Sequence, residues 1–309
     1  MASEPGPVLI TGAGGFVGRA LVHALAGTRP IIATDRTGLD FGGLPDVAVI
    51  PGEIDDRALV ARLAAEPVSA IIHLATIPGG AAEADPARAA CVNVAAPMTL
   101  FDALAAHGNT PRLLFASSIA VFGEPLPPRI DDAAPVRPIL RYGAHKAMVE
   151  EWIATLTRRG AVRGLSLRLP GILARPPAPS GMTSAFLSNL FHALKTGEPI
   201  TLPVSADATC WLLSRRAVTM QLLAMLELDC DPESARLNLP ALRVRMGDLV
   251  AEIARQTGAD PLLARHVPED AIEAAFGAQP PLSTQAADTL GLTHDGDLAA
   301  LVASALADI

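Results

Sequence analysis

The stretch "VLITGAGGFVGRALVHAL", residues 8–25, places three glycines between a short apolar run and an amphipathic segment. Gly12 allows a tight turn, Gly15 lets the backbone approach a pyrophosphate, and Gly18 lets a helix pack closely on the strand. The N-terminus of that helix then faces the anion. An acidic residue, Asp35, stands at the tip of the next apolar run. An ordinary glycine-rich turn does not require that residue, so the pattern predicts a dinucleotide-binding βαβ unit.

Asp35 also bears on which dinucleotide is bound. A carboxylate at this position accepts hydrogen bonds from both hydroxyls of an adenosine ribose and repels a 2′-phosphate, so NAD is favoured over NADP. Arg36 complicates the choice, because a guanidinium could pair with a phosphate or stack on the adenine.

The composition of the 309-residue chain narrows the classes of protein to which it can belong. Half of the residues are hydrophobic and 18% are charged, which excludes a disordered chain and fits a buried, mostly parallel sheet. The net charge of −8 argues against a nucleic-acid partner. The longest uncharged span, 176–194, is interrupted by prolines and polar residues, and the N-terminus does not resemble a signal peptide. We therefore expect no membrane partner.

The three cysteines, Cys91, Cys210 and Cys230, are scattered along the chain. They form no CxxC pair and no Cys/His cluster at ligand spacing, so neither a disulfide framework nor a metal site is predicted. We expect them to be small core residues in a reducing cytoplasm.

Up to about residue 170, short apolar runs alternate with amphipathic segments. The predicted strands cover residues 8–10, 30–35, 47–50, 70–75, 112–117 and 164–169. The predicted helices cover residues 16–25, 56–65, 88–107 and 139–159. Pro97 lies inside the third helix and should kink it or start a new segment. This alternation predicts an α/β fold with a doubly wound parallel sheet of the Rossmann type.

Beyond Pro170 the alternation becomes less regular. We predict a loop at 174–181, helices at 183–194, 216–228 and 246–257, strands at 209–214 and 234–239, and helix and turn over 282–309. The predicted organisation is an NAD-binding domain at 1–171, whose sheet and helix are completed by about 208–229. A smaller α/β substrate-binding cap at 172–309 is interleaved with it.

The stretch "RYGAHKAM", residues 141–148, holds the only tyrosine of the chain, Tyr142, and one of its two lysines, Lys146. The two lie four residues apart on a predicted helix and therefore share one face. A surface tyrosine beside a surface lysine would be the simple interpretation. Composition argues against it, since 22 of the 24 basic residues are arginine, which shows that lysine is seldom used where charge alone is needed.

Lysine offers chemistry at this position that arginine does not. A compact ammonium can lower the pKa of a neighbouring phenol and donate to a ribose hydroxyl, and a phenol so adjusted is a usable base for an alcohol. Ser117 and Ser118 end the fifth predicted strand, where a hydroxyl could orient a substrate oxygen. Ordinary loop polarity would also explain the two serines.

Four stretches and two single residues together match the pattern of one family. They are "TGAGGFVG" (11–18), "HLA" (73–75), "SSIAVFG" (117–123), "YGAHK" (142–146), Asp35 and Asn93. In order and spacing they resemble the extended short-chain dehydrogenases/reductases, which include nucleotide-sugar epimerases, over the first 170 residues. The resemblance implies that Ser118 is the catalytic serine and Tyr142 the general base. Lys146 would bind the nicotinamide ribose and tune the tyrosine.

The resemblance also implies which residues meet the cofactor and the substrate. The NAD contacts would be Gly12, Gly15, Phe16, Val17, Gly18, Asp35, Arg36, Glu53, Ile54, Leu74, Ala75, Thr76, Asn93, Tyr142, Lys146, Gly171 and Ile172. Glu53 departs from the aspartate that is more usual, and Asn93 would tie the loop after the fourth strand to a helix. The substrate contacts would be Thr76, Ser118, Ile119, Tyr142 and Arg175.

The chain departs from the nucleotide-sugar members after the sixth strand, where it reads "RLPGILARP", 168–176. Gly171 stands where many of those members carry an asparagine that holds the substrate diphosphate, so a small substrate is suggested. The stretches 199–218 and 236–258 resemble a branch that oxidises a four-carbon sugar acid, D-erythronate, with NAD. The expected activity is NAD-dependent oxidation of the C2 hydroxyl of such an acid, and a sugar acid is the expected partner.

An acidic substrate needs a cation or backbone donors in its pocket. Arg175 is our candidate for the carboxylate partner, because its guanidinium matches a carboxylate, although it could equally be a surface arginine in a proline-rich loop. Trp211 could wall the pocket, but packing in the cap is favoured. We expect structural roles for His73 and His145.

Two other functions stay open. One is a nucleotide-sugar epimerase or dehydratase that retains NAD tightly, and the other is a non-catalytic dinucleotide sensor, which would not need Tyr142 or Lys146. The resemblance also predicts a homodimer that pairs through the helices at 88–107 and 139–159.

Overall fold

The computed structural model describes residues 6–177, 183–228 and 235–309, which form two compact units. The first unit comprises 1–121, 138–168 and 222–237, and the second comprises 122–137, 169–221 and 238–309. Cys230 and part of the predicted loop at 174–181 lie outside the described residues.

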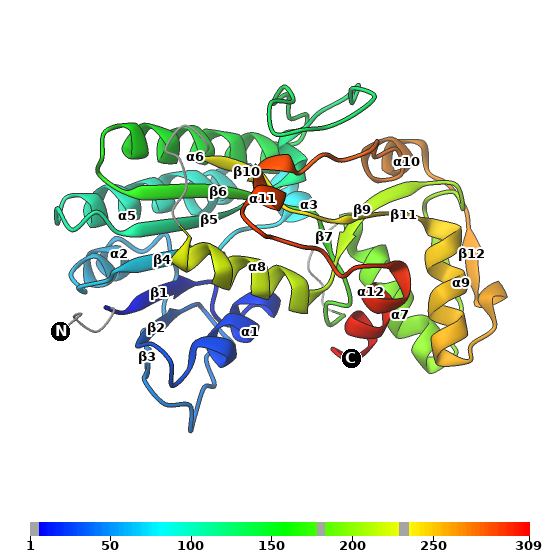
Figure 1. Cartoon of the computed structure of the whole chain (residues 1–309), viewed down its shortest axis with the longest axis horizontal. Helices are drawn as coiled ribbons and strands as arrows, with labels where there is room; N and C mark the ends of the chain where they lie inside the picture. Colours follow the sequence, from blue (N-terminus) through cyan, green and yellow to red (C-terminus); the bar gives the residue numbers. More distant parts are fainter. Residues whose placement is uncertain (1–5, 178–182, 229–234) are drawn as a thin grey trace. The chain divides into compact units, whose positions relative to one another are not determined.

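The first unit is built on a seven-stranded sheet in the order β10-β6-β5-β4-β1-β2-β3 (Figure 1). The strands are β1 (Val8–Thr11), β2 (Ile31–Thr34), β3 (Val47–Val49), β4 (Ala70–His73), β5 (Arg112–Ser118), β6 (Arg163–Leu169) and β10 (Arg236–Asn238). The pairs formed by β1 with β2 and β4, by β2 with β3 and by β4 with β5 are parallel. The predicted doubly wound Rossmann-type sheet is confirmed.

The helices of the first unit follow the predicted ranges closely. They are α1 (Phe16–Leu25), α2 (Arg57–Ala64), α3 (Gly79–Ala84), α4 (Pro86–Ala90), η1 (Cys91–Ala95), α5 (Ala96–Ala105), the short turn η2 (Ile119–Val121) and α6 (Arg141–Arg158). From β1 the chain first adds β2 and β3 on one side of the sheet and then β4, β5 and β6 on the other. Because crossovers between parallel strands are right-handed, the helices of these two halves cover opposite faces of the sheet.

One face of this sheet carries a continuous apolar core. Side chains point alternately to the two faces of each strand, and this face carries Leu9 of β1, Ile71 of β4 and Phe115 of β5. They form a single cluster with side chains of α2, α5 and α6. Phe101 of α5 is completely buried in it. Truncating such a side chain to alanine costs about 3–5 kcal/mol of unfolding free energy, so this cluster strongly stabilises the sheet that carries the site.

Pro97 has the predicted effect on its helix. Because proline has no amide hydrogen to donate one turn back, the regular α-helical pattern stops before it, and the chain forms the π-helical turn η1 instead. The amide of Ala96 accordingly bonds five residues back, to the carbonyl of Cys91. The predicted single segment at 88–107 is therefore three consecutive helical pieces.

The second unit contains a three-stranded sheet, β11-β9-β7, and a two-stranded sheet, β12-β8. Its strands are β7 (Gly171–Ile172), β8 (Ile200–Leu202), β9 (Thr209–Leu213), β11 (Leu242–Arg245) and β12 (Ala264–His266). Its helices are η3 (Thr183–Ala185), α7 (Phe186–Thr196), α9 (Met246–Thr257), η5 (Pro261–Leu263), α10 (Asp270–Phe276), α11 (Gln285–Thr289) and α12 (Leu298–Leu306), and α8 (Arg215–Glu227) runs from this unit into the first.

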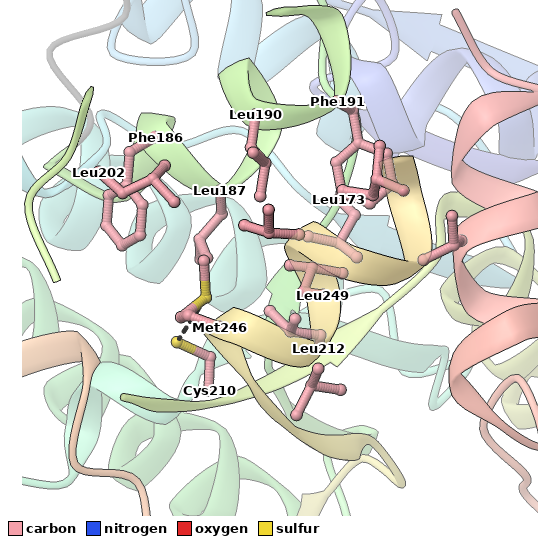
Figure 2. Packing of buried hydrophobic residues seen from close by; sticks show 14 of the residues in the cluster. Leu173, Phe186, Leu187, Leu190, Phe191, Leu202, Cys210, Leu212, Met246 and Leu249 are labelled. Atoms are coloured by element: carbon pink, nitrogen blue, oxygen red, sulfur yellow. Dashed lines mark hydrogen bonds between the residues drawn. The ribbon is translucent and has the colours of Figure 1, made fainter. Parts of the chain in front are cut away.

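The second unit has a core of its own, centred on α7, β9 and α9. Phe191, Leu212 and Leu249 are fully buried there, and Figure 2 shows their side chains converging between the helices and the strand. Cys210 belongs to this core, and burial raises the pKa of its thiol to about 12. The expected core role of Cys210 is confirmed, whereas Cys91 is exposed.

One detail of the predicted organisation is wrong. The segment 208–229 was expected to complete the large sheet, but its strand, β9, pairs with β7 and β11 in the small sheet. The large sheet ends instead with β10, where the amide of Ser166 donates to the carbonyl of Ala235. An apolar run predicts that a strand exists, but its pairing partner is decided by tertiary contacts.

No helix in the described ranges combines the length and the apolar composition that a membrane crossing requires.

Candidate active site

The turn between β1 and α1 can exist only with glycines. Gly12 has a φ of 71°, and a Cβ added there would lie 2.7 Å from the amide nitrogen of Ala75. A Cβ on Gly18 would lie 2.1 Å from the carbonyl oxygen of Gly12. Gly15 is the N-cap of α1 and supplies no side-chain cap to the first-turn amides. These features leave backbone surface and a helix N-terminus for a diphosphate, so the turn fits NAD.

Asp35 is held directly beside this turn. One carboxylate oxygen accepts a hydrogen bond from the amide of Gly14 at 3.1 Å, and the other accepts one from the amide of Arg36 at 2.6 Å. Gly14 is a further residue that must be glycine, since a Cβ there would lie 1.9 Å from the carbonyl oxygen of Thr37. The carboxylate of Asp35 and the glycine turn are thus fixed to each other through a backbone contact, while the contact of Asp35 with the ribose stays a prediction.

Two arginines near Asp35 share one acidic partner. The guanidinium of Arg36 lies 3.8 Å from Glu53, and that of Arg88 lies 3.0 Å from the other oxygen of Glu53. All three side chains are about half exposed, so these pairs contribute little to stability. Arg36 therefore has a carboxylate partner within the protein, which weakens its case as a 2′-phosphate ligand.

Asn93 anchors the loop that follows β4. Its side-chain oxygen accepts hydrogen bonds from the amide of Ile77 at 2.7 Å and from the hydroxyl of Thr76 at 3.1 Å. Its side-chain nitrogen donates to the carbonyl of Ile77 at 2.9 Å. The predicted tie between this loop and a helix is present, and the π-helical turn before Pro97 presents the asparagine. Its contact with NAD stays a prediction.

The first turn of α6 is positioned by two neighbouring segments. Glu83 of α3 accepts a hydrogen bond from the amide of Arg141 at 2.7 Å and pairs with its guanidinium at 2.8 Å, which caps the helix beside Tyr142. Gly143 contacts the η2 turn so closely that an added Cβ would lie 2.0 Å from the carbonyl oxygen of Ala120. The half-buried Tyr142 is thus held between α3 and the end of β5.

Lys146 is buried under Tyr142, with 2% of its surface exposed. Its ammonium donates to the carbonyl of Ala116 at 2.7 Å, lies 4.6 Å from the ring centre of Phe115 and lies 5.4 Å from that of Tyr142. Burial lowers the pKa of Lys146 to about 7, while the charge of Glu150 acts to raise it. The prediction that this lysine is no ordinary surface residue is confirmed.

The two serines at the end of β5 differ in burial and in their hydrogen-bond partners. The half-buried Ser118 is the last residue of β5, a strand that contacts α6, and its hydroxyl accepts a hydrogen bond from the amide of Ala120 at 3.1 Å. Ser117 is buried and donates to the carboxylate of Glu150. Parallel strands gather ligands at their carboxyl ends, and Ser118 stands at such an end.

Both histidines near the site are buried. His73 shares a hydrogen bond of 2.9 Å with the hydroxyl of Thr11 and stacks on Phe115, and burial lowers its pKa to about 3. Burial likewise lowers the pKa of His145. Neutral, packed rings agree with the expected structural roles.

Gly171, Ile172, Arg175 and Trp211 belong to the second unit, whereas Phe16, Val17, Ile54, Leu74, Ala75 and Ile119 belong to the first. Gly171 and Ile172 form β7, and the carbonyl of Arg175 accepts a hydrogen bond from His192 at 2.8 Å. Trp211 is 1% exposed, and its indole donates to the carbonyl of Pro280 at 2.7 Å, so the favoured packing role is confirmed. The NAD contacts of Gly171 and Ile172 and the substrate contact of Arg175 stay predictions.

Three residues with contacts at the site were not predicted from the sequence: Gly14, Glu83 and Glu150. Glu150 follows Tyr142 and Lys146 at the same spacing of four residues, so the sequence could have placed it on the same face of the helix. Gly14 and Glu83 act through tertiary contacts, for which the local sequence holds no signal.

The fold and its glycine turn define a dinucleotide-binding protein of the Rossmann class. Residues 8–234 match the NAD dependent epimerase/dehydratase family. The chain belongs to that family, and its cofactor is NAD. The prediction of an extended short-chain enzyme that acts on a CH–OH group is confirmed.

Two curated relatives are D-erythronate dehydrogenases. That of Cupriavidus necator is 35% identical over 265 residues, which are 81% of this chain and 82% of the relative. That of Haemophilus influenzae is 30% identical over 259 residues, with the same coverage. The solved structure of a nucleoside-diphosphate-sugar epimerase from Agrobacterium tumefaciens is 28% identical, with a TM-score of 0.87 over 97% of this chain and 93% of that one.

Proposed function

We propose that this chain is an NAD-dependent dehydrogenase that oxidises the C2 hydroxyl of a short sugar acid, D-erythronate, to 2-dehydro-D-erythronate. The observation that carries the proposal is the buried lysine beside the single tyrosine, at the strand end that bears Ser118. The names of the two relatives support the substrate, because their similarity to this chain extends over four fifths of its length.

In the proposed reaction, each residue of the group has one task. Ser118 holds the C2 hydroxyl oxygen, and Tyr142, as phenolate, removes its proton. Lys146 binds the nicotinamide ribose and supports the phenolate with its positive charge. Bound NAD would supply the acceptor for the hydride that leaves C2. The products are the 2-keto acid, NADH and the proton taken by Tyr142.

The other contacts complete the proposal. Phe16, Val17, Ile54, Leu74 and Ala75 line NAD together with the residues described above, and Ile119 and Thr76 meet the substrate. Arg175 pairs with the substrate carboxylate. The domain at 1–171 binds NAD and the region 172–309 binds the substrate. We further propose a cytoplasmic homodimer that pairs through the helices at 88–107 and 139–159.

The alternative is a nucleotide-sugar epimerase or dehydratase, which the epimerase of known structure favours. The two functions differ in what they release. A dehydrogenase forms free NADH in proportion to sugar acid consumed, whereas an epimerase retains NAD and converts a UDP- or GDP-sugar without net NADH.

The proposal is tested with a panel of four- to six-carbon sugar acids, with UDP-sugars as the contrasting set. We expect NADH formation with a four-carbon acid, measured at 340 nm, and none with UDP-sugars. Tyr142→Phe should lower kcat by about 10²–10⁴-fold, the usual contribution of a positioned base, while NAD binding stays close to that of the wild type. Unchanged turnover in Tyr142→Phe would refute the assignment of the base.

A further inference from the structure

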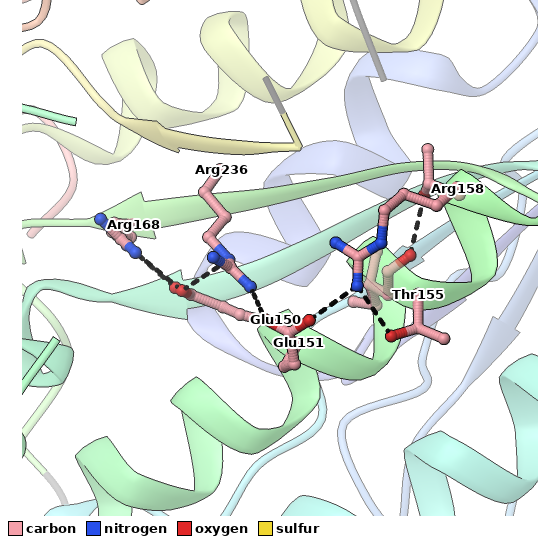
Figure 3. Close-up of polar contacts among 8 residues, drawn as sticks. Glu150, Glu151, Thr155, Arg158, Arg168 and Arg236 are labelled. Carbon is pink, nitrogen blue, oxygen red and sulfur yellow. Dashed lines mark hydrogen bonds and ion pairs between the residues drawn. The ribbon is translucent and has the colours of Figure 1, made fainter. Parts of the chain in front are cut away.

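A buried ionic cluster lies one helical turn beyond the catalytic lysine. Glu150 is 1% exposed, and Arg168 of β6 binds it in a bidentate pair, with nitrogen–oxygen distances of 3.0 and 2.9 Å. The hydroxyl of Ser117 donates to the same carboxylate, and Arg236 of β10 lies 3.6 Å from it. Figure 3 shows the two arginines converging on Glu150 from the strands.

A buried ion pair of this kind is not explained by stability alone. Removing two charges from water costs several kcal/mol per ion, and replacing such a pair by apolar residues of similar volume is often neutral or stabilising. The position of Glu150 suggests another reason for the pair. Tyr142, Lys146 and Glu150 recur every four residues, so they share one face of α6.

The contacts of Glu150 connect α6, which carries Tyr142 and Lys146, with the end of β5, which carries Ser118. Ser117 directly precedes Ser118 on β5, and Lys146 donates to the carbonyl of Ala116 on the same strand. Two side chains of α6, at positions 146 and 150, therefore form hydrogen bonds with two of the last three residues of β5, Ala116 and Ser117. Arg168 adds the adjacent strand, β6, to the same contact.

Glu150 also supplies the acidic charge that acts on Lys146. Other titratable or charged groups around the lysine are Tyr142, His145, His73 on β4, Glu83 on α3 and Arg168 on β6. Burial keeps the two histidines from carrying charge at neutral pH, and Glu83 is bound by Arg141.

We propose that Glu150 is a positioning residue of the active site, which fixes α6 against the end of β5 and so fixes the place of Lys146 beside Tyr142. Arg168 and Ser117 act with it by orienting its carboxylate. The inference rests on the proposed function for the task of Lys146, but the contacts and the charge of Glu150 belong to the protein without substrate.

The chain offers a direct measurement, because it has only two lysines, Lys146 and Lys195. Full-length protein labelled with [ε-13C]lysine gives two NMR signals, and Lys195→Arg assigns them. We expect Glu150→Gln to lower the pKa of Lys146 by about one unit, as expected when a nearby opposite charge is lost. In the same variant, kcat/KM with NAD and the sugar acid should fall by at least about tenfold, because small displacements of positioned groups are costly.

The adjacent residue provides the matched control. Glu151 is 59% exposed and pairs with Arg158 at 2.8 Å and with Arg236, so Glu151→Gln removes the same charge but leaves the contacts of Glu150 with Arg168 and Ser117 in place. It should leave the pKa of Lys146 and kcat/KM unchanged. An unchanged pKa of Lys146 in a folded Glu150→Gln protein would overturn the proposal, and so would an equal effect of Glu151→Gln.

A second variant keeps the test decisive where Glu150→Gln fails to fold. The double substitution Glu150→Met with Arg168→Met replaces the ion pair by apolar side chains. It should show the same fall in the pKa of Lys146, and a wild-type pKa would again overturn the proposal. A wild-type protein that produces no NADH from any sugar acid contradicts the proposed function alone, because the titration needs no substrate.

Discussion

At the scale of single residues, the site depends on a charged group that folding places in an unfavourable environment. Burial lowers the pKa of Lys146 from its ordinary 10.5 to about 7. Between pH 7 and 10.5 the unfolded chain binds more protons at this lysine than the folded chain does. The free energy of unfolding of the wild type therefore rises with pH between 7 and 10.5. Below pH 7, Lys146 is charged in both states, and the full free-energy cost of burying its charge destabilises the folded chain.

Lys146→Met removes this penalty, and the protein without NAD should become more stable at pH 6. The lost hydrogen bond to Ala116 offsets part of the gain, which leaves a net effect on the order of 2 kcal/mol in the free energy of unfolding. The gain should shrink or reverse at pH 10. Urea unfolding at both values measures it, with the exposed Lys195→Met as control. A difference that is the same at both pH values would contradict the pKa shift.

At the scale of elements, the turn between β1 and α1 and the loop after β2 act as one piece. Gly14→Ala should force them apart, because its Cβ would lie 1.9 Å from the carbonyl oxygen of Thr37 and its amide also holds Asp35. We expect KM for NAD to rise about tenfold or more, since overpacking costs about 1–3 kcal/mol. Discrimination against NADP should fall, while kcat changes little.

The control for this substitution lies in the same loop. At Gly42 an added Cβ would meet only the side chain of Asp40, at 3.5 Å, so Gly42→Ala should leave both cofactor constants unchanged. Steady-state kinetics with NAD and NADP measure the two variants. Equal KM values for NAD in the two variants would show that the contact between Gly14 and Thr37 does not position Asp35.

The same scale shows what the sequence could predict. The apolar periodicity and the glycine turn place α1 at 16–25 and the first six strands to within a few residues, because these signals are local. The strands β7, β8 and β12 were not predicted, because they have only two or three residues each and so carry little pattern of their own. The pairing of β9 and the burial of Glu150 depend on distant partners, and a charged residue is normally expected at the surface.

At the scale of the whole molecule, cofactor binding should be measurable as stability. A ligand that binds only the folded chain at 100 times its Kd adds about 2.7 kcal/mol to the free energy of unfolding. NAD at that concentration should therefore raise Tm by a few degrees, and NADP at the same concentration should raise it less, because Asp35 repels a 2′-phosphate.

Gly12→Val is the variant that tests whether this stabilisation comes from the glycine turn. A side chain at Gly12 would collide with the backbone of Ala75 and distort the glycine turn, where the diphosphate is expected, so NAD should no longer shift Tm. Circular dichroism of the variant without NAD establishes that it is folded. A folded Gly12→Val protein that NAD still stabilises by the full amount would mean that NAD binds elsewhere in the molecule.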